Sequence, residues 1–187
     1  DTVEVVRRAA VENPWFLPQE IIRAVKAIRC EMLERQRLEA WAGAYPPVRT
    51  PKRVLVVMAG NIPLVGFFDL LCVLASGHAC RVKPSSKDTV LIGYVVDLLR
   101  TIDPAIPLRM AEQGERLDAV IATGSDNANR YFRMLFGGIP SLLRGSRQSV
   151  AVLSGRETAA ELSGLEEDIF AYSGLGCRNV SLLFLPR

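Results

Sequence analysis

The stretch RVLVVM, residues 53–58, decides the fold of this chain. It is a continuous apolar run of strand length, rich in β-branched residues, which is typical of a strand buried on both faces of a parallel sheet. The turn AGNIP follows at residues 59–63, and residues 65–75 predict a helix that is apolar nearly all round. A buried strand, a tight turn and a buried helix in this order are the first half of a βαβ unit.

The same alternation continues toward the C-terminus. Further strands are predicted at residues 79–82, 117–122 and 149–153, and further helices at residues 88–101 and 127–136. Asp88 stands where the first of these helices begins, as a natural N-cap. Strands that alternate with helices of this length form a parallel sheet with right-handed crossovers. The pattern therefore predicts an α/β fold in which helices cover both faces of a parallel sheet.

The N-terminal segment has a different pattern. Residues 1–45 are predicted to be helical, with an interruption between Pro14 and Pro18 and one amphipathic helix over residues 19–38. We interpret this helix as a packing element without chemistry. Three prolines in residues 45–51 exclude both helix and central strand, so this stretch is predicted to be a linker.

Composition narrows the class of protein. The 187 residues include 23 basic and 20 acidic side chains, which gives a net charge of +3. This charge is too small, and the basic residues are too scattered along the chain, to indicate a nucleic-acid-binding surface. The four cysteines are irregularly spaced without a CxxC pair, which predicts reduced thiols in a cytoplasmic protein, with neither disulfides nor a zinc site. The longest apolar run, residues 62–75, is broken by Asp69 and is shorter than the roughly 20 residues of a membrane span.

Polar turns follow three of the predicted strands, and ligands of parallel sheets bind at the carboxyl ends of strands. These turns contain Asn61, then Lys83 and Ser86, and then Thr123, Gly124 and Ser125. Gly124 and Ser125 precede a helix N-terminus, where free N–H groups favour a phosphate, and Lys83 can donate to ribose or phosphate oxygens. No GxGxxG motif is present, so two interpretations stay open, a nucleotide site or ordinary turn residues with a solvated lysine.

Cys177 stands on a glycine-rich turn within IFAYSGLGCRNVSLLFL, residues 169–185. Gly174 and Gly176 can adopt positive φ and let a ligand approach the backbone, while Arg178 favours a thiolate. The alternative is that Cys177 is a small buried apolar residue. The single histidine, His78, lies on a helix-to-strand turn at the opposite end of the sheet, which argues against a Cys–His pair.

Together these motifs resemble a known family. The order AGNIP, SGHACRVKPSS, ATGS, SVAVL and GLGC is similar to the nucleotide-binding half of the aldehyde dehydrogenase superfamily. The longer runs GNIPLVGFFDLLCVLASGH, DAVIATGSDNANRYF and DIFAYSGLGCRNVS resemble the LuxC-like family of acyl-CoA reductases, which make long-chain fatty aldehyde. The resemblance implies an aldehyde-dehydrogenase-like, Rossmann-related sheet preceded by a helical segment. It also implies these roles: Asn61 as oxyanion-hole amide, Lys83 on the adenosine ribose, Thr123, Gly124 and Ser125 along the pyrophosphate, and Cys177 as acyl-accepting nucleophile.

Two departures from the superfamily pattern refine the expected chemistry. A Glu-Leu-Gly-Gly element that carries the hydrolytic base of many relatives aligns with RGSR, residues 144–147, so the base is missing and a thioester on Cys177 should last long enough to accept hydride. Ser86 replaces an acidic residue that would repel a ribose 2′-phosphate, which favours NADPH over NADH.

The resemblance implies NADPH-dependent reduction of a long-chain acyl-CoA or acyl-protein thioester, with a homo-oligomer or an acyl-transfer protein as further partners. The expected domains are residues 1–50, helical segment and linker; 51–165, dinucleotide-binding domain; and 166–187, the start of a catalytic domain in what we expect to be an N-terminal fragment. The alternatives are a nucleotide-binding fragment without turnover and a CoA-acylating aldehyde dehydrogenase acting on a short substrate.

Overall fold

The computed structural model of the chain describes residues 1–186 and separates the chain into two compact units, residues 1–145 and 146–187. Arg187, the last residue of the predicted catalytic segment, lies outside the described residues. The functional domain boundaries at residues 50 and 165 stay predictions.

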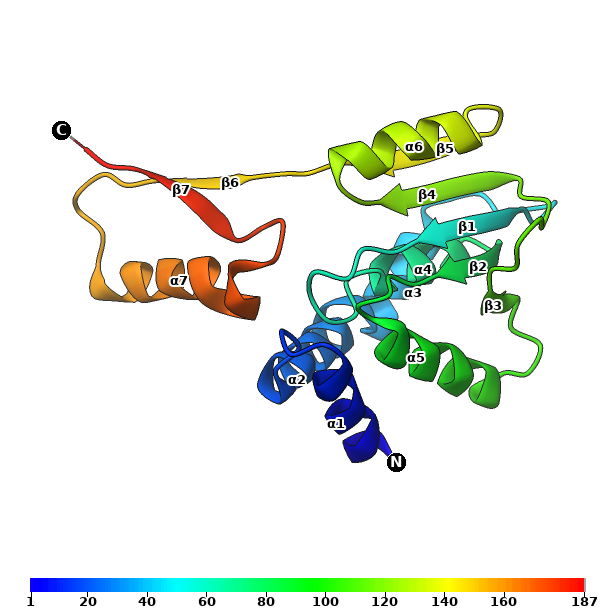
Figure 1. Ribbon diagram of the computed structural model, residues 1–187, viewed down its shortest axis with the longest axis horizontal. Coiled ribbons are helices and arrows are strands. Elements are labelled where there is room, and N and C mark those ends of the chain that lie inside the picture. Colours follow the sequence, from blue (N-terminus) through cyan, green and yellow to red (C-terminus); the bar gives the residue numbers. More distant parts are fainter. Residues whose placement is uncertain (187) are drawn as a thin grey trace. The chain divides into compact units, whose positions relative to one another are not determined.

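The first unit is built on a five-stranded parallel sheet (Figure 1). Its strands are β1 (Arg53–Val57), β2 (Ala79–Lys83), β3 (Leu108–Met110), β4 (Ala119–Thr123) and β5 (Ser141–Arg144). They lie in the order β3-β2-β1-β4-β5, and all the pairings are parallel. The predicted α/β fold with a parallel sheet is therefore confirmed.

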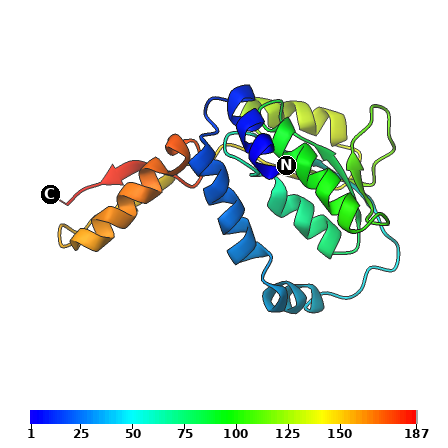
Figure 2. The ribbon, with the colours of Figure 1, turned by 90° about the horizontal axis from the view of Figure 1, so that it is seen from below.

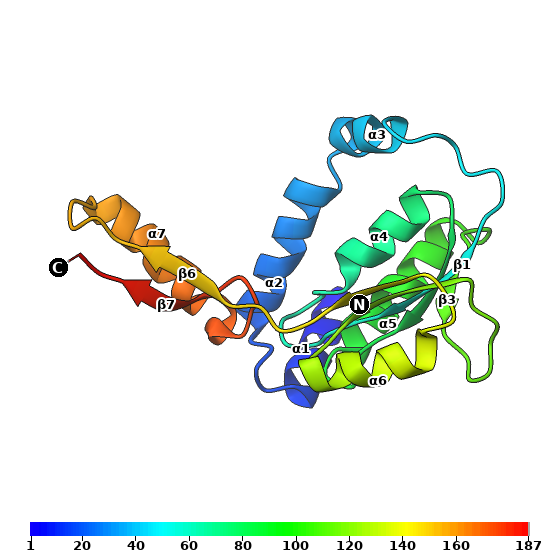
Figure 3. The ribbon, with the colours of Figure 1, turned by 90° about the horizontal axis from the view of Figure 1, so that it is seen from above.

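Helices cover the two faces of this sheet unequally. The helices α4 (Phe67–Ala75) and α5 (Thr89–Ile102) follow β1 and β2 and lie on one face, which Figure 2 shows from below. The helix α6 (Asp126–Phe136) connects β4 to β5 in the opposite direction and lies on the other face, on the side of the strands opposite α4 in Figure 3. This arrangement follows from right-handed crossovers that run outward from the sheet centre in both directions.

The apolar core lies mainly between the sheet and the α4–α5 face. It includes the side chains of Val56, Leu70, Cys80, Val82 and Ile92, which are fully buried. A smaller core on the other face joins β1 and β4 to the apolar side of α6. The predicted burial of the β1 strand on both faces is thus confirmed.

The N-terminal residues form the helices α1 (Thr2–Glu12), α2 (Pro18–Ala27) and α3 (Arg35–Gly43), with a π-helical turn over Ile28–Met32. The predicted single helix over residues 19–38 is wrong, because the chain leaves helical geometry at Leu33 and Glu34. The Glu34 side chain then accepts hydrogen bonds from two backbone N–H groups and caps α3. Figure 2 shows α1 beside α5, and Ala9 and Phe16 add to the core.

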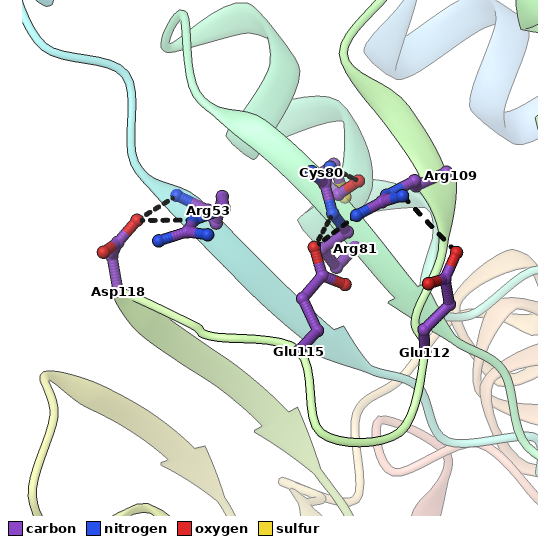
Figure 4. Close-up of polar contacts among 7 residues, drawn as sticks. All are labelled: Arg53, Cys80, Arg81, Arg109, Glu112, Glu115 and Asp118. Carbon is purple, nitrogen blue, oxygen red and sulfur yellow. Dashed lines mark hydrogen bonds and ion pairs between the residues drawn. The ribbon is translucent and has the colours of Figure 1, made fainter.

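An ion-pair network holds the loop between β3 and β4 (Figure 4). Glu115 Oε1 accepts hydrogen bonds from Arg81 Nε at 2.6 Å and from Arg109 Nη2 at 2.7 Å. Burial raises the pKa of Glu115, but the two arginines outweigh it and hold that pKa below its usual range. Asp118 accepts from the backbone N–H and the guanidinium of Arg53 at the amino end of β1. The network fixes this loop on the strands it connects.

The second unit contains a parallel pair of strands, β6 (Ser149–Val152) and β7 (Val180–Phe184), joined through α7 (Ala159–Phe170) and the 3-10 turn Ala171–Gly174. The prediction that residues 149–153 form the fourth strand of the main sheet is wrong, since these residues pair with β7. The short strand β5 takes that place beside β4. The side chains of β6 alternate between half-buried and exposed, so this strand does not occupy a sheet interior.

Candidate functional site

The polar residues expected to bind a nucleotide gather at the carboxyl edge of the five-stranded sheet. Val57, the end of β1, pairs with Lys83 on one side and with Ala122 on the other. The connection that follows β1 runs to β2 on one side, and the connection that follows β4 runs to β5 on the other side. The strand order therefore reverses its direction between β1 and β4. Such a switch point is where open α/β sheets bind ligands.

Lys83 ends β2 with an exposed side chain, and its carbonyl accepts from the N–H of Met58 at 2.9 Å. Asn61 is half-buried in the turn that follows β1, and Ser86 is exposed in the turn that follows β2. The structure therefore leaves Lys83 and Ser86 open to a ligand at the end of β2.

The third turn already has internal partners. Ser125 is the N-cap of α6, and its Oγ accepts from the N–H of Ala128 at 3.3 Å. The Gly124 N–H donates to the carbonyl of Arg144 at 3.1 Å. A Cβ on Gly124 would lie 3.0 Å from Ala128 Cβ, so its close contact with the first turn of α6 by itself favours glycine here. Thr123, half-buried, ends β4 beside Arg144.

Arg144 and Asp69 form an ion pair that the sequence reasoning missed. Arg144 Nη1 lies 2.6 Å from both Oδ1 and Oδ2 of Asp69, which stands in the first turn of α4. The residue aligned with the hydrolytic glutamate of relatives is thus a cation whose charge is neutralised by a partly buried carboxylate. The available signal was Asp69 itself, a charged residue inside an otherwise apolar helix.

Asp88 also has an unexpected role. It is the N-cap residue of α5, yet its side chain makes no capping hydrogen bond to that helix. Its Oδ2 instead accepts from the N–H of Leu64 at 2.8 Å, in the turn that carries Asn61. Burial raises the pKa of Asp88 to about 7, and the Leu64 hydrogen bond opposes this rise.

Cys177 is exposed on the turn between α7 and β7. Tyr172 and Ser173 have φ of 53° and 56° and Gly174 has 70°, whereas Gly176 does not adopt the positive φ that we expected it to be able to take. Asn179, which the sequence reasoning missed, holds this turn: its Oδ1 accepts from the Gly176 N–H at 2.7 Å and its Nδ2 donates to two α7-end carbonyls. Hydrogen bonds between the Asn179 side chain and the backbone thus hold the turn on which Cys177 is exposed.

The four thiols differ in accessibility. Burial raises the pKa of the Cys80 thiol to about 12 and also raises the pKa of Cys72. Cys30 and Cys177 are exposed. The alternative that Cys177 is a buried apolar residue is therefore wrong for the described unit.

Six predicted site residues thus lie in the first unit, at one sheet edge, and Cys177 lies in the second. Among residues 1–186, no group of three or more His, Cys, Asp or Glu side chains is placed to bind a metal ion. Within the same range, no helix has the length and apolar character needed to cross a membrane.

Comparison with known proteins finds no matching family model and no matching curated sequence. Solved structures do match. An NAD+ complex of aldehyde dehydrogenase from Bacillus cereus superposes with a TM-score of 0.68 at 18% identity, covering 98% of this chain and 43% of that one. Aldehyde dehydrogenase 21 from Physcomitrella patens, solved with succinate, gives 0.69 at 15% identity, covering 97% and 44%. A mutant of aldehyde dehydrogenase C from Pseudomonas syringae, with NAD+ and octanal, gives 0.68 at 16%, covering 99% and 45%.

The chain spans less than half the length of these structures. At such low identity the likeness shows a common fold, and it confirms the predicted aldehyde-dehydrogenase-like fold.

Proposed function

We propose that the chain is the cofactor-binding part of an acyl-CoA reductase that reduces a long-chain acyl thioester to the aldehyde with NADPH. The observation that carries this proposal is the polar carboxyl edge at the switch point between β1 and β4, where Lys83 and Ser86 are open to a ligand. The aldehyde-dehydrogenase-like fold and the LuxC-like motifs of the sequence support it.

The exposed thiol of Cys177 supplies the nucleophile in this proposal. Its thiolate attacks the thioester carbonyl, the CoA thiolate leaves, and the acyl group remains on the cysteine. NADPH supplies the hydride that reduces this acyl group, after which the Cys177 thiolate leaves and the aldehyde is released. The backbone N–H of Cys177 donates to the carbonyl oxygen as negative charge develops on it, and Asn61 keeps the role of oxyanion-hole amide that the resemblance implies.

The Arg144–Asp69 pair supports reduction over hydrolysis. A guanidinium that is held by a carboxylate cannot accept a proton from water, so the residue at the position of the hydrolytic glutamate is no general base. The acyl group on Cys177 then persists until hydride or CoA removes it.

Ser86 and Lys87 support NADPH as the preferred cofactor, with NADH as the alternative. Both residues are exposed in the turn after β2, and neither repels a ribose 2′-phosphate. The four free thiols are consistent with a cytoplasmic protein.

The test is acylation followed by mass measurement. Incubation with a long-chain acyl-CoA in the absence of NADPH should add one acyl group to Cys177, and addition of NADPH should remove it and release aldehyde. Cys177→Ser should abolish the adduct, whereas Cys30→Ser, which removes the other exposed thiol, should retain it. An adduct on any other cysteine, or none in a protein that spans the length of the matched structures, contradicts the proposal.

A second candidate is nucleotide binding without turnover. The observation that favours it is that the strand-end residues expected to bind the nucleotide all lie within one unit, residues 1–145. Binding of NADPH without any aldehyde from acyl-CoA would select this candidate. Aldehyde formation from short acyl chains alone would select a CoA-acylating aldehyde dehydrogenase.

A further inference from the structure

The loop after β1 and the loop after β2 are joined at two points. At the first, Gly60 lies so close to Ser85 that a Cβ added to Gly60 would be 2.5 Å from Ser85 Cβ. At the second, the Leu64 N–H donates to Asp88 Oδ2 at 2.8 Å. The two joints lie on either side of residues 61–63, so they restrict the segment that carries Asn61.

The second joint is buried and specific. Asp88 is 2% exposed, and its Oδ1 has no hydrogen-bond partner among residues 1–186. A buried carboxylate with one free oxygen is costly, and an aspartate that only capped its own helix would avoid that cost by facing solvent. The burial of the Asp88 carboxylate therefore indicates that its hydrogen bond with the Leu64 N–H has a structural role beyond helix capping.

The backbone at Leu64 shows why the contact is needed. Leu64 has φ of 57°, in the left-handed region that a leucine adopts only where its surroundings hold it there. Its N–H donates to Asp88 Oδ2, and the buried leucine side chain packs in the core. Without the Asp88 carboxylate, the turn over residues 61–64 loses the hydrogen-bond acceptor that holds Leu64 in its left-handed conformation.

The N-terminal segment holds the loop after β2. Asn13 Nδ2 donates to the carbonyl of Lys87 at 3.1 Å, and the Lys87 N–H donates to Ser85 Oγ at 3.2 Å. The Asp88 N–H donates to the Ser85 carbonyl at 3.0 Å. The loop after β2 is thus a fixed support against which the loop after β1 is positioned.

We propose that Asp88 is a positioning residue for the cofactor site: its buried carboxylate fixes the loop that carries Asn61 against the loop that carries Lys83 and Ser86. The two loops then form one rigid edge for a dinucleotide. This inference rests on the proposed function, because it names the residue that organises the proposed site.

The protonation of Asp88 can be followed by NMR, because its carboxylate accepts a hydrogen bond from the backbone amide of Leu64. Glu12 at the end of α1 and Lys87 in its own loop line the same shallow pocket as Asp88, and residues 58–66 carry no charged side chain. Burial raises the pKa of Asp88 to about 7. The amide proton of Leu64, which donates to this carboxylate, should therefore shift in an NMR pH titration with a midpoint near 7, and Asp88→Asn should abolish that titration.

The functional test is NADPH titration by calorimetry at pH 8. Asp88→Ala removes the acceptor and should weaken NADPH binding about tenfold. Asp88→Asn keeps an oxygen acceptor for Leu64 and should stay within about twofold of wild type. Asp103→Asn is the matched control, since Asp103 also accepts a backbone N–H, from Ala105, but at the exposed far end of α5. It should leave binding unchanged.

A second variant keeps the test decisive if Asp88→Ala does not fold. Gly60→Ala leaves Asp88 in place but forces the two loops apart, and it should weaken NADPH binding to a similar extent. Folded Asp88→Ala that binds NADPH as wild type does, or a Leu64 amide whose hydrogen exchange is unchanged in that variant, overturns the positioning role. If wild type binds neither NADPH nor NADH, the proposed function itself fails.

Discussion

The two units of the chain differ in how much apolar surface they bury. In the first, side chains such as Leu70, Val56 and Ile92 are fully enclosed between sheet and helices. In the second, no residue of 146–186 is buried, and Val152 and Phe170 are 76% and 67% exposed. The first unit can fix its strand-end residues through its own core, whereas the Cys177 turn depends on local hydrogen bonds such as those of Asn179.

The largest expected effect tests this contrast directly. Leu70→Ala should lower the free energy of unfolding by about 2–5 kcal/mol, because Leu70 is 0% exposed and its loss leaves a cavity. The matched change Leu182→Ala, at a leucine that is 50% exposed in β7, should change it by about 0.5 kcal/mol or less. Urea denaturation measures both. A Leu182→Ala cost equal to that of Leu70→Ala would show a core in the second unit that the structure lacks.

The next prediction concerns the pH dependence of the stability of the first unit. Asp88 is buried with its pKa raised to about 7 from 3.8, so between these values the unfolded chain has lost the proton that the folded chain keeps. Stability from this group is therefore fully present below pH about 4 and is lost as pH rises to about 7, by up to roughly 4 kcal/mol.

Asp88→Asn should remove this loss, so the wild-type and variant unfolding curves should diverge between pH 4 and 7. Acids with lowered pKa values, such as Glu115 and Asp118, act in the opposite sense, since their stabilisation is lost as pH falls. They are common to both proteins and cancel in the difference. Parallel curves for the two proteins would refute the buried state of Asp88.

The third prediction concerns binding at the carboxyl edge. Lys83→Ala should weaken NADPH binding by about 1–3 kcal/mol, because a charge-assisted hydrogen bond to ribose or phosphate is lost. Lys52→Ala is the control, an exposed lysine next to the amino end of β1. Calorimetry on both variants measures the difference. Equal dissociation constants for Lys83→Ala and wild type would show that Lys83 is a solvated surface lysine that does not bind the cofactor.

The smallest effect is expected for cofactor preference. Ser86→Glu places a carboxylate beside the expected 2′-phosphate and should shift the ratio of NADPH to NADH affinity toward NADH by about 1 kcal/mol or less, as expected for an exposed charge. The ratio of the two dissociation constants is the measurement. A ratio that does not move would mean that the turn after β2 does not face the ribose.

The sequence predicted the elements of the first unit best where apolar runs are continuous. β1, β2 and β4 and the helices that follow them were recognisable because their strands are apolar runs: β1 is buried on both faces, and β2 and β4 alternate between buried and half-buried residues. β3 and β5 were missed, since they have three and four residues and are partly exposed. β6 was placed in the wrong sheet because strand length alone does not identify a partner.

The candidate site also contains residues that the sequence pattern identified and residues whose roles it did not. The strand-end position of Lys83 follows from local pattern. The roles of Asp88 and of the Arg144–Asp69 pair depend on contacts between residues far apart in sequence, which pattern cannot supply. Ser125 was recognised as a helix start, but the local rule did not show that its hydroxyl is already used for capping.

The order of strands in the first unit has a consequence for how the protein is made. β1 pairs with β2 and also with β4, and Val54 aligns with Ala119. During synthesis, at roughly 5–20 residues per second, the edge of β1 that will receive β4 stays unpaired for seconds after β2 has left the ribosome. Non-local parallel pairing of this kind is slow to form and exposes the nascent chain to aggregation. Growth temperature and chaperone supply should therefore govern the yield of soluble protein.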